Sequence, residues 1–347
     1  ELVSWLVENH LIMSATAQRK DLSDPKIISC FASHVRNERR LIAIYLLTVA
    51  DVRGTGPKIW NAWKGKLLED LFWKTWRYLC GEPYAGGILE THKIRALELL
   101  QDDPIPTGAH KQFWSELDTT YFLQNDPQEI AWHVRQLYYR INTLVPVVKA
   151  RAVPAGDGVH VMVYTSDQKD LFLRICKFFE HIDYSIVEAK IHTTKSGYAL
   201  DSFLVLNPFK SAGQYRDVTR IVEHGLKQEL EQQLPLKSPS QVRVSRHLKH
   251  FPITPEVGIE PDERGAYHVL SIVAGDQPEL LSRVAQVLVG SDVRVHGAKV
   301  NTMGERAEDI FLITGKILNE TKTLIKLEEE ILSILQIPDK LTKIKSG

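Results

Sequence analysis

The sequence predicts an α+β protein of several domains, helical in its first part and built from a repeated strand–helix unit in its second. Helical patterns of apolar residues follow one another through residues 1–145, without a convincing alternating strand. Beyond them, residues 161–194 and 270–303 align at a constant offset of 109, which matches Asp167 to Asp276. An internal repeat of this length indicates two copies of one small domain.

Each copy shows the same order of elements. A short apolar run, 161–164 or 270–274, is followed by a polar turn and then by a stripe of apolar residues with helical spacing. The stripe contains Leu171, Ile175, Phe178 and Phe179 in the first copy and Leu280, Val284, Val287 and Leu288 in the second. Alternating segments and a second helical pattern follow. The order strand, helix, strand, strand, helix predicts a small sheet with helices on one face.

The turn between strand and helix is the first candidate site. Asp167 with Asp170, and Asp276 with Glu279, have the spacing of an N-cap and its acidic N3 partner, so we expect both helices to begin at the first Asp. A helix N-terminus offers N–H groups and a positive dipole end that suit a carboxylate ligand. Most such units bind nothing, and the acids then only cap the helix.

The doubled D-Q-x-x-L turn resembles the turn of tandem ACT domains, the amino-acid-sensing modules of metabolic enzymes, which have a ferredoxin-like βαββαβ fold. That family usually has D-x-P-G-L, whereas the glycine position here holds Asp170 and Glu279, and only the second copy keeps the proline. The resemblance implies that an amino acid binds at these turns. The implied binding residues are Asp167, Gln168, Asp170, Leu171, Asp276, Gln277, Pro278, Glu279 and Leu280.

Two residues of the helical part are candidate metal ligands. His10 and Asp51 each lie in an otherwise apolar helical segment, within residues 5–25 and 46–71. A lone His or Asp in such a place is usually a hydrogen-bonded core residue. Imidazole and carboxylate groups from different helices are also how helical metallohydrolases hold a divalent cation that activates water. The residues alone leave both interpretations open.

With the tandem repeats behind it, this helical part resembles the bacterial PII uridylyltransferase and uridylyl-removing enzyme family. That family joins a nucleotidyltransferase domain, an HD-type phosphohydrolase domain and two ACT domains. It attaches UMP, from UTP, to a tyrosine of the PII signal-transduction protein when glutamine is scarce and hydrolyses it off when glutamine is abundant. The resemblance implies PII as partner, glutamine as effector and a divalent metal, Mg or Mn, as cofactor.

The HD pattern is matched only in part. Asp51 matches its late Asp and His10 a later His, whereas the first His and the His-Asp doublet have no counterpart in the sequence. The transferase signature, a Gly-Ser turn before an Asp-x-Asp pair, is also missing. We therefore expect the C-terminal part of a longer enzyme, with part of the hydrolase site and no transferase site. The resemblance implies a metal-activated water that attacks the tyrosyl-UMP ester, with Arg53 and Lys20 near the phosphate.

We expect five segments. They are residues 1–145, the C-terminal part of an HD-type domain; 146–158, a linker or entering strand; 159–240, the first ACT domain; 241–266, an inter-repeat segment; and 267–347, the second ACT domain. Two pieces of the inter-repeat segment, VRVSR at residues 242–246 and ITPEVGI at residues 253–259, are candidates for a strand that completes a neighbouring sheet, and the sequence does not decide between them.

Composition argues against several classes of function. The 43 basic and 43 acidic residues give a net charge of zero, so neither a nucleic-acid partner nor a polybasic membrane anchor is expected. The apolar run 41–50 is too short to span a bilayer. Three separated cysteines fit reduced thiols and a cytoplasmic protein.

Two alternatives remain. One is a catalytically inactive module that binds an amino acid, and the other is an alarmone hydrolase with HD and ACT domains. The two repeats follow the helical part directly, without a β-rich domain between them, which counts against the alarmone hydrolase.

Overall fold

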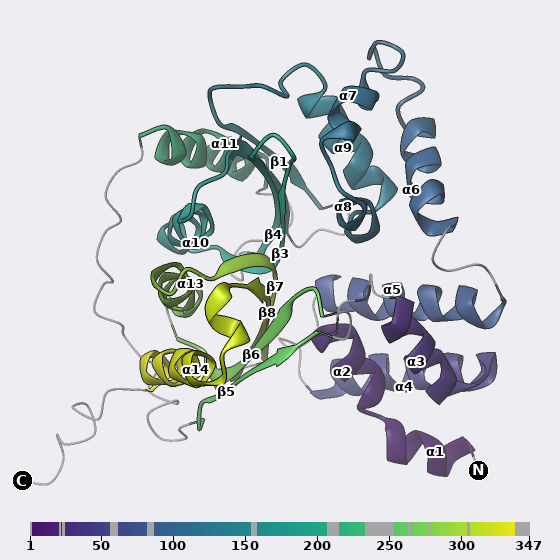
Figure 1. Ribbon diagram of the computed structural model, residues 1–347. Coiled ribbons are helices and arrows are strands. Elements are labelled where there is room, and N and C mark those ends of the chain that lie inside the picture. Colours follow the sequence, from purple (N-terminus) through teal and green to yellow (C-terminus); the bar gives the residue numbers. More distant parts are fainter. Residues whose placement is uncertain are drawn as a thin grey trace, which may run out of the picture. The chain divides into compact units, whose positions relative to one another are not determined.

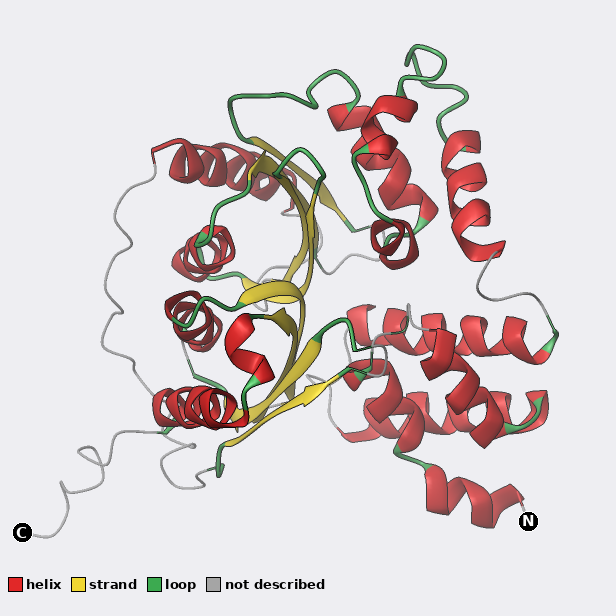
Figure 2. Ribbon diagram, viewed as in Figure 1, coloured by secondary structure: helices red, strands yellow, loops and turns green. Residues whose placement is uncertain are grey.

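The computed structural model divides the chain into two compact units. One comprises Glu1–Thr143 with Thr193–Gly197, and the other Leu144–His192 with Tyr198–Gly347. The structure describes residues 2–20, 22, 25–55, 62–81, 87–153, 158–206, 215–232, 253–262, 265–277, 279–303 and 306–336. The predicted α+β class is confirmed, since residues 2–143 form helices and loops in their described part and the strands belong to the second unit (Figure 2).

The first unit is a set of packed helices. They are α1 Leu2–Asn9, α2 Ile12–Arg19, α3 Pro25–Val35, α4 Glu38–Thr55, α5 Ala62–Leu79, α6 Gly87–Glu98, α7 His110–Ser115, α8 Thr119–Gln124 and α9 Pro127–Leu137. Helix α5 packs against α2, α3 and α4, and α9 packs against α6 and α7. The predicted helix start near residue 126 is confirmed: the Asp126 side chain caps α9 by accepting from the Glu129 N–H at 2.8 Å.

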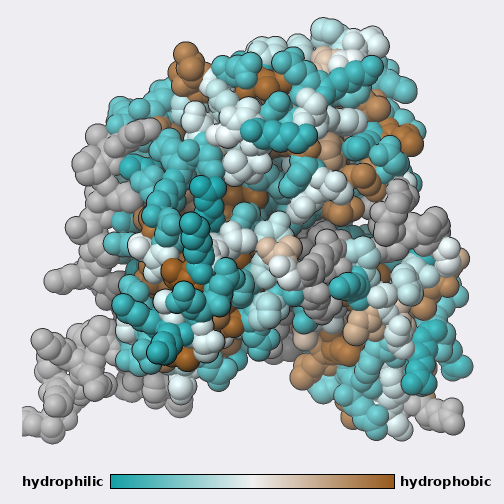
Figure 3. Space-filling model, viewed as in Figure 1, coloured by the Kyte–Doolittle hydropathy of each residue, from teal (hydrophilic) through white to brown (hydrophobic). Residues whose placement is uncertain are grey.

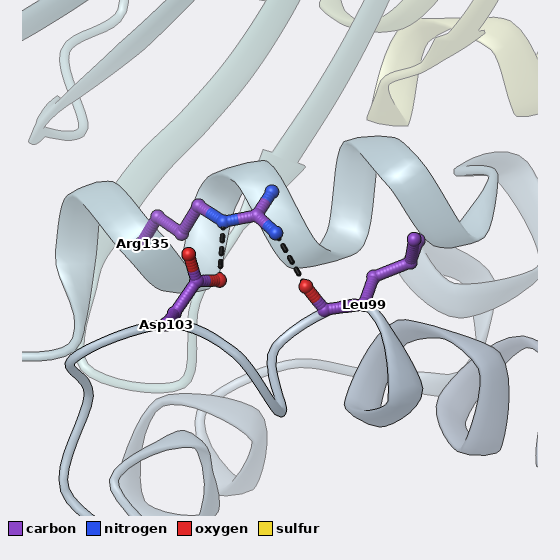
Figure 4. Close-up of polar contacts among 3 residues, drawn as sticks. All are labelled: Leu99, Asp103 and Arg135. Carbon is purple, nitrogen blue, oxygen red and sulfur yellow. Dashed lines mark hydrogen bonds and ion pairs between the residues drawn. The ribbon is translucent and has the colours of Figure 1, made fainter.

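A guanidinium ties α9 to the end of α6. Arg135 Nε donates to Asp103 Oδ2 at 2.6 Å, and Arg135 Nη2 donates to the Leu99 carbonyl at 2.5 Å (Figure 4). Carbonyls at a helix C-terminus lack partners within the helix, so a cation there stabilises the end of α6. This contact fixes the loop of residues 99–109 against α9.

The second unit is one antiparallel sheet with helices on one face (Figure 1). Its strands are β1 Val147–Ala152, β2 Val159–Ser166, β3 Ser185–Thr193, β4 Tyr198–Leu206, β5 Glu256–Pro261, β6 His268–Gly275, β7 Arg294–Met303 and β8 Arg306–Thr314. They pair in the order β1-β2-β4-β3-β7-β8-β6-β5. The helices are α10 Leu171–His181, α11 Tyr215–Gln232, α13 Leu280–Gly290 and α14 Thr321–Leu335, with the short 3₁₀ helix η2 Lys316–Asn319 before α14.

The predicted βαββαβ order is wrong for the described residues. Each half has the order ββαββα, because its fourth strand precedes the repeated segment instead of following its last helix. In the first half this strand is β1, which pairs with β2, and in the second it is β5, which begins inside the segment ITPEVGI and pairs with β6. The other candidate strand, VRVSR at residues 242–246, lies outside the described residues. The entering strand expected between residues 146 and 158 is therefore an edge strand of the sheet.

The two halves meet about a local two-fold axis. Strands β3 and β7 pair antiparallel, and Ala189 lies opposite Ala298, its own counterpart at the offset of 109. A pairing that places equivalent residues opposite each other makes the contact isologous. Every position of one repeat that faces the other therefore has a symmetry-related counterpart, whether or not the residue there makes the same contact. We call this axis the dyad.

One apolar core extends across both halves. It contains Val161 and Phe203 from the first half and Leu270 and Phe311 from the second, all at most 1% exposed. Helices α10 and α13, which have the predicted apolar stripe, pack against each other above the dyad. Burial of these stripes stabilises the pair at about 25 cal/mol per Å² of apolar surface.

None of the helices that the structure describes combines the length and apolar character that crossing a bilayer requires. In Figure 3 hydrophilic residues cover most of the visible face, and hydrophobic residues lie between them in small groups. Among the exposed apolar residues are Val3 and Val7 on α1 and Leu46 on α4.

Candidate functional site

The two candidate metal ligands lie at the surface of the helical unit. His10 is exposed at the break between α1 and α2, where its Nδ1 is 2.8 Å from the Val7 carbonyl oxygen. Asp51 is exposed on α4. Helix α4 packs against both α1 and α2, so the two residues come from elements of one bundle. Neither is a buried core residue, which was the simpler interpretation of the sequence.

The described residues do not make a complete metal site. Nowhere among them do three or more His, Cys, Asp or Glu side chains come close enough together to hold a metal ion. Catalytic zinc sites have three protein ligands, and a site with fewer protein donors leaves most of the coordination of a divalent cation to water and substrate. His10 and Asp51 can therefore supply only part of a ligand set in the described chain.

The first-repeat turn, residues 167–171, joins β2 to α10. Asp167 and Lys169 are exposed, Gln168 and Asp170 are half-buried, and Leu171 is buried. Asp170 Oδ2 accepts from Arg174 Nε at 2.9 Å, and Arg174 Nη2 lies 2.9 Å from the same oxygen. The Asp170 carboxylate is thus directed along the helix and not onto its N-terminus.

The second-repeat turn, residues 276–280, joins β6 to α13. Asp276 is exposed, and Gln277 is only 5% exposed. Gln277 Nε2 donates to the Leu335 carbonyl at the end of α14 at 3.1 Å, and Arg283 Nη1 donates to Gln277 Oε1 at 3.3 Å. Both ends of this amide are therefore held. Leu280 is buried, Glu279 is half-buried and Pro278 lies outside the described residues.

The prediction that Asp167 and Asp276 start the helices is wrong. Helices α10 and α13 begin at Leu171 and Leu280, and their N-cap positions hold Asp170 and Glu279, neither of which makes a side-chain capping bond. The reason is local, since each Leu N–H already bonds back to the carbonyl of Gln168 or Gln277 in a tight turn, at 3.1 and 3.3 Å.

The two turns also differ in backbone conformation. Glu279 has φ +61°, in the left-handed region that glycine adopts without strain, whereas Asp170 has φ −102°. The second turn therefore keeps the backbone expected of a glycine at this position although a glutamate occupies it. A non-glycine residue in this region costs on the order of 1 kcal/mol.

Charged side chains cross from each repeat to the other at the dyad. Lys169 Nζ lies 2.8 Å from Asp292 Oδ1, and Arg294 Nη1 lies 3.8 Å from Asp167 Oδ2, so the first-repeat turn faces the end of α13 and the start of β7. Asp292 is itself in the left-handed region, at φ +57°, where it ends α13. The Lys169 ammonium, which hydrogen-bonds to it, lowers the pKa of Asp292.

At the symmetry-related end the contact is a helix cap. The backbone N–H of Ser282, in the first turn of α13, donates to Glu180 Oε1 of α10 at 3.1 Å. Burial raises the pKa of Glu180, while its hydrogen bonds with Ser282 act in the opposite direction. The dyad relates this pair to Val289 and Leu173, which offer no carboxylate.

Two buried aspartates were missed by the sequence analysis. Asp201 on β4 and Asp309 on β8 are each 1% exposed, and both precede by two residues a core phenylalanine, Phe203 or Phe311. They are equivalent once the offset is reduced from 109 to 108 after the hairpin between the two strands. The motif D-x-F in two apolar strands was the signal that would have found them.

Asp201 lies beneath the first turn of α10. It is opposite Val163 in β2, nearer to the turn than Phe203, whose ring lies 6.4 Å from that of Phe172 in the first turn of α10. Its Oδ1 has no hydrogen-bond partner in the part of the chain that the structure describes. Burial and then the Asp167 carboxylate raise the pKa of Asp201 well above its usual value, and a hydrogen bond from the His192 backbone opposes this.

Comparison with known proteins gives consistent matches. Residues 85–136 match the family model of the uridylyltransferase GlnD fifth domain. A bifunctional uridylyltransferase/uridylyl-removing enzyme of Nitrosospira multiformis is 58% identical over 336 residues, which are 96% of this chain and 38% of that enzyme. The enzymes of the same name from Aromatoleum aromaticum and Cupriavidus pinatubonensis are 50% and 48% identical over 97% of this chain and 39% of their own lengths. The chain spans about two fifths of the length of these relatives.

Proposed function

We propose a function for this chain on the basis of its homologues. Over nearly its whole length it is homologous to part of the bifunctional uridylyltransferase/uridylyl-removing enzymes, which confirms the resemblance seen in the sequence. The chain is the hydrolase and sensor portion of an enzyme that attaches UMP to the PII signal-transduction protein and removes it. Glutamine is the effector, and UTP and UMP are the substrate and product of the whole enzyme. The observation that carries the proposal is the 58% identity over 96% of the chain.

In this proposal the helical unit is the remainder of an HD-type uridylyl-removing domain, within residues 1–145. His10 and Asp51 belong to a site for Mg or Mn, and the packing of α1, α2 and α4 into one bundle supports their proximity. The further ligands have to come from outside the described residues, because these do not contain a third donor beside them.

The paired repeats, residues 159–240 and 267–347, are the ACT pair that senses glutamine. Supporting features are the antiparallel sheet with helices on one face, the dyad, and the two turns that each end at a helix N-terminus. We place the protein in the cytoplasm, where its three free cysteines stay reduced.

The test uses the intact protein with PII and UMP-modified PII. Transfer of UMP to PII and release of UMP are measured with and without glutamine. We expect glutamine to increase release. His10→Ala and Asp51→Ala are expected to abolish release while leaving transfer unchanged, with Glu8→Ala, an exposed neighbour on α1, as the control.

The outcomes separate the alternatives. Normal release in both variants would remove His10 and Asp51 from the site. Glutamine binding without either reaction would favour the catalytically inactive sensor module, and release from guanosine alarmones instead of UMP-modified PII would favour the alarmone hydrolase.

A further inference from the structure

The dyad makes the two turns comparable position by position. The N-terminus of α13 faces Glu180 in the last turn of α10. By the same symmetry, the N-terminus of α10 faces Val289, the counterpart of Glu180 in the last turn of α13. A carboxylate at a helix N-terminus satisfies N–H groups and favours the dipole. Glu180 therefore already holds the place that an amino-acid carboxylate would take at α13.

Other contacts fix the second-repeat turn as well. The Gln277 amide is buried and bonded both to the end of α14 and to Arg283. A buried amide with both of its ends paired costs free energy to displace, because each broken bond leaves a desolvated group behind. A ligand at this turn would have to displace Glu180 and disturb Gln277 as well.

The first-repeat turn contacts the other repeat through ion pairs that are largely exposed. In the pair Lys169–Asp292 the side chains are 57% and 81% exposed, and in the looser pair Arg294–Asp167 they are 74% and 29% exposed. Exposed pairs contribute little to stability and weaken further in salt. These contacts across the dyad can be broken at low cost, and Arg294 can then pair with an anion instead of Asp167.

Beneath the same turn lies an acceptor without a donor. The Asp201 carboxyl is fully buried, and its Oδ1 has no hydrogen-bond partner among the described residues. A buried polar atom without a partner costs on the order of 1 to 3 kcal/mol, and a buried charge costs more. An ammonium or primary amide N–H would satisfy this oxygen, and α10 supplies N–H groups for a carboxylate close by.

We propose that one amino-acid ligand binds per chain, at the first-repeat turn, where Asp201 accepts an N–H from the ligand's nitrogen, and that Glu180 keeps the second-repeat turn closed. The proposal rests on the proposed sensing of glutamine and adds which copy binds it and through which residue. Since the first-repeat turn contacts Asp292 and Arg294 of the other repeat, displacing it on binding changes contacts across the dyad. The Glu180 cap keeps the two repeats together while this happens.

The test is calorimetry of L-glutamine binding to the intact protein and to variants in which the residues at the symmetry-related positions 180 and 289 are exchanged. We expect one ligand per chain. Val289→Glu, which gives α10 the carboxylate that α13 has, is expected to weaken binding at least tenfold, whereas the reverse change Glu180→Val leaves the affinity of the first site within about threefold. Asp201→Asn is expected to weaken binding at least tenfold.

Controls separate loss of binding from loss of folding. Val289→Thr changes the same position without charge and is expected to bind normally, and thermal unfolding of each variant shows whether it folds. Two ligands per wild-type chain, or normal binding by both folded Val289→Glu and Asp201→Asn, would overturn the inference while glutamine sensing stands. If the wild type binds another amino acid but not glutamine, the proposed effector is wrong and the same variants are measured with that ligand. Absence of binding by any amino acid overturns both.

Discussion

The first-repeat and second-repeat turns have the same sequence pattern, occupy symmetry-related places and differ in nearly every contact. The second is bonded through a buried amide and capped by Glu180 from the other repeat. The first is joined to the other repeat by exposed ion pairs and lies over Asp201. The two dyad-related ends thus keep the same fold and differ in their contacts, one held by buried hydrogen bonds and the other by ion pairs.

The difference shows how two symmetry-related ends of one fold can come to make different contacts. The dyad fixes the backbone of both ends, so single residues such as Glu180 and Val289 decide whether a helix N-terminus is occupied. Substitutions at the pairing of β3 with β7, at Asp201, at Glu180 and at Lys169 test this difference.

The largest effect is expected at the dyad itself. Ala298 is 4% exposed opposite Ala189, so Ala298→Asp buries a carboxylate without a partner. We expect the free energy of unfolding of the sheet unit to fall by about 3 to 5 kcal/mol, measured by urea denaturation. The control is Ser271→Asp, exposed on β6. Equal effects of the two substitutions would mean that β3 and β7 do not pair in solution.

Next in size is the pH-dependent effect of Asp201. The pKa of Asp201 is raised in the folded chain, so between the unfolded and folded pKa values the folded chain holds a proton that the unfolded chain has lost. Stability therefore falls as the pH rises through this range and is constant above it. Asp201→Asn is expected to stabilise the chain by about 1 to 2 kcal/mol at neutral pH.

The pH profile makes this prediction specific. The gain from Asp201→Asn should disappear as the pH falls toward about 4, where aspartate is protonated in the unfolded chain as well. The measurement is urea denaturation of both proteins between pH 4 and 8. A loss of stability that is the same at every pH would show instead that the carboxylate is needed for packing. With the calorimetry above, a more stable chain that binds less ligand would indicate a residue kept for binding.

Asp201 also illustrates what the sequence could and could not predict. Periodicity and the offset of 109 were enough for the α+β class, the repeat, the helical stripes and the location of both turns, because these depend on local patterns. The aspartates escaped because the offset changes to 108 after the hairpins, at residues 194–197 and 303–305.

The two errors and the missed contact come from interactions that the sequence patterns did not include. Both helices start later than predicted because the Leu171 and Leu280 N–H groups bond back to Gln168 and Gln277 in tight turns. The edge strand β5 comes from the segment before its repeat. The bond from Ser282 to Glu180 joins residues 102 positions apart, and only the register at the dyad brings them together.

An effect of similar size but opposite direction is expected from the cap across the dyad. Glu180→Ala leaves the Ser282 N–H in the first turn of α13 without its acceptor, and we expect a loss of about 1 to 2 kcal/mol in the free energy of unfolding. Glu180→Gln keeps an acceptor oxygen and is expected to lose less than half as much. Equal losses for the two variants would assign the effect to the charge and not to the hydrogen bond. Urea denaturation at pH 7 distinguishes the two.

The smallest effect is expected for Lys169→Ala in the first-repeat turn. The ion pair with Asp292 is exposed on both sides, so its loss should leave the denaturation midpoint unchanged within error at physiological ionic strength, about 0.15 M. Because the pKa of Asp292 is lowered in the folded chain, any stability from this pair is fully present above the pKa of aspartate in the unfolded chain. It is lost as the pH falls through the pKa of Asp292 in the folded chain. Because the turn has to move for a ligand to reach Asp201, Lys169→Ala should bind glutamine at least as tightly as the wild type. A loss of stability as large as that of Glu180→Ala, or weaker binding, would mean that the first-repeat turn is as firmly held as the second, and the asymmetry between them would lose its basis.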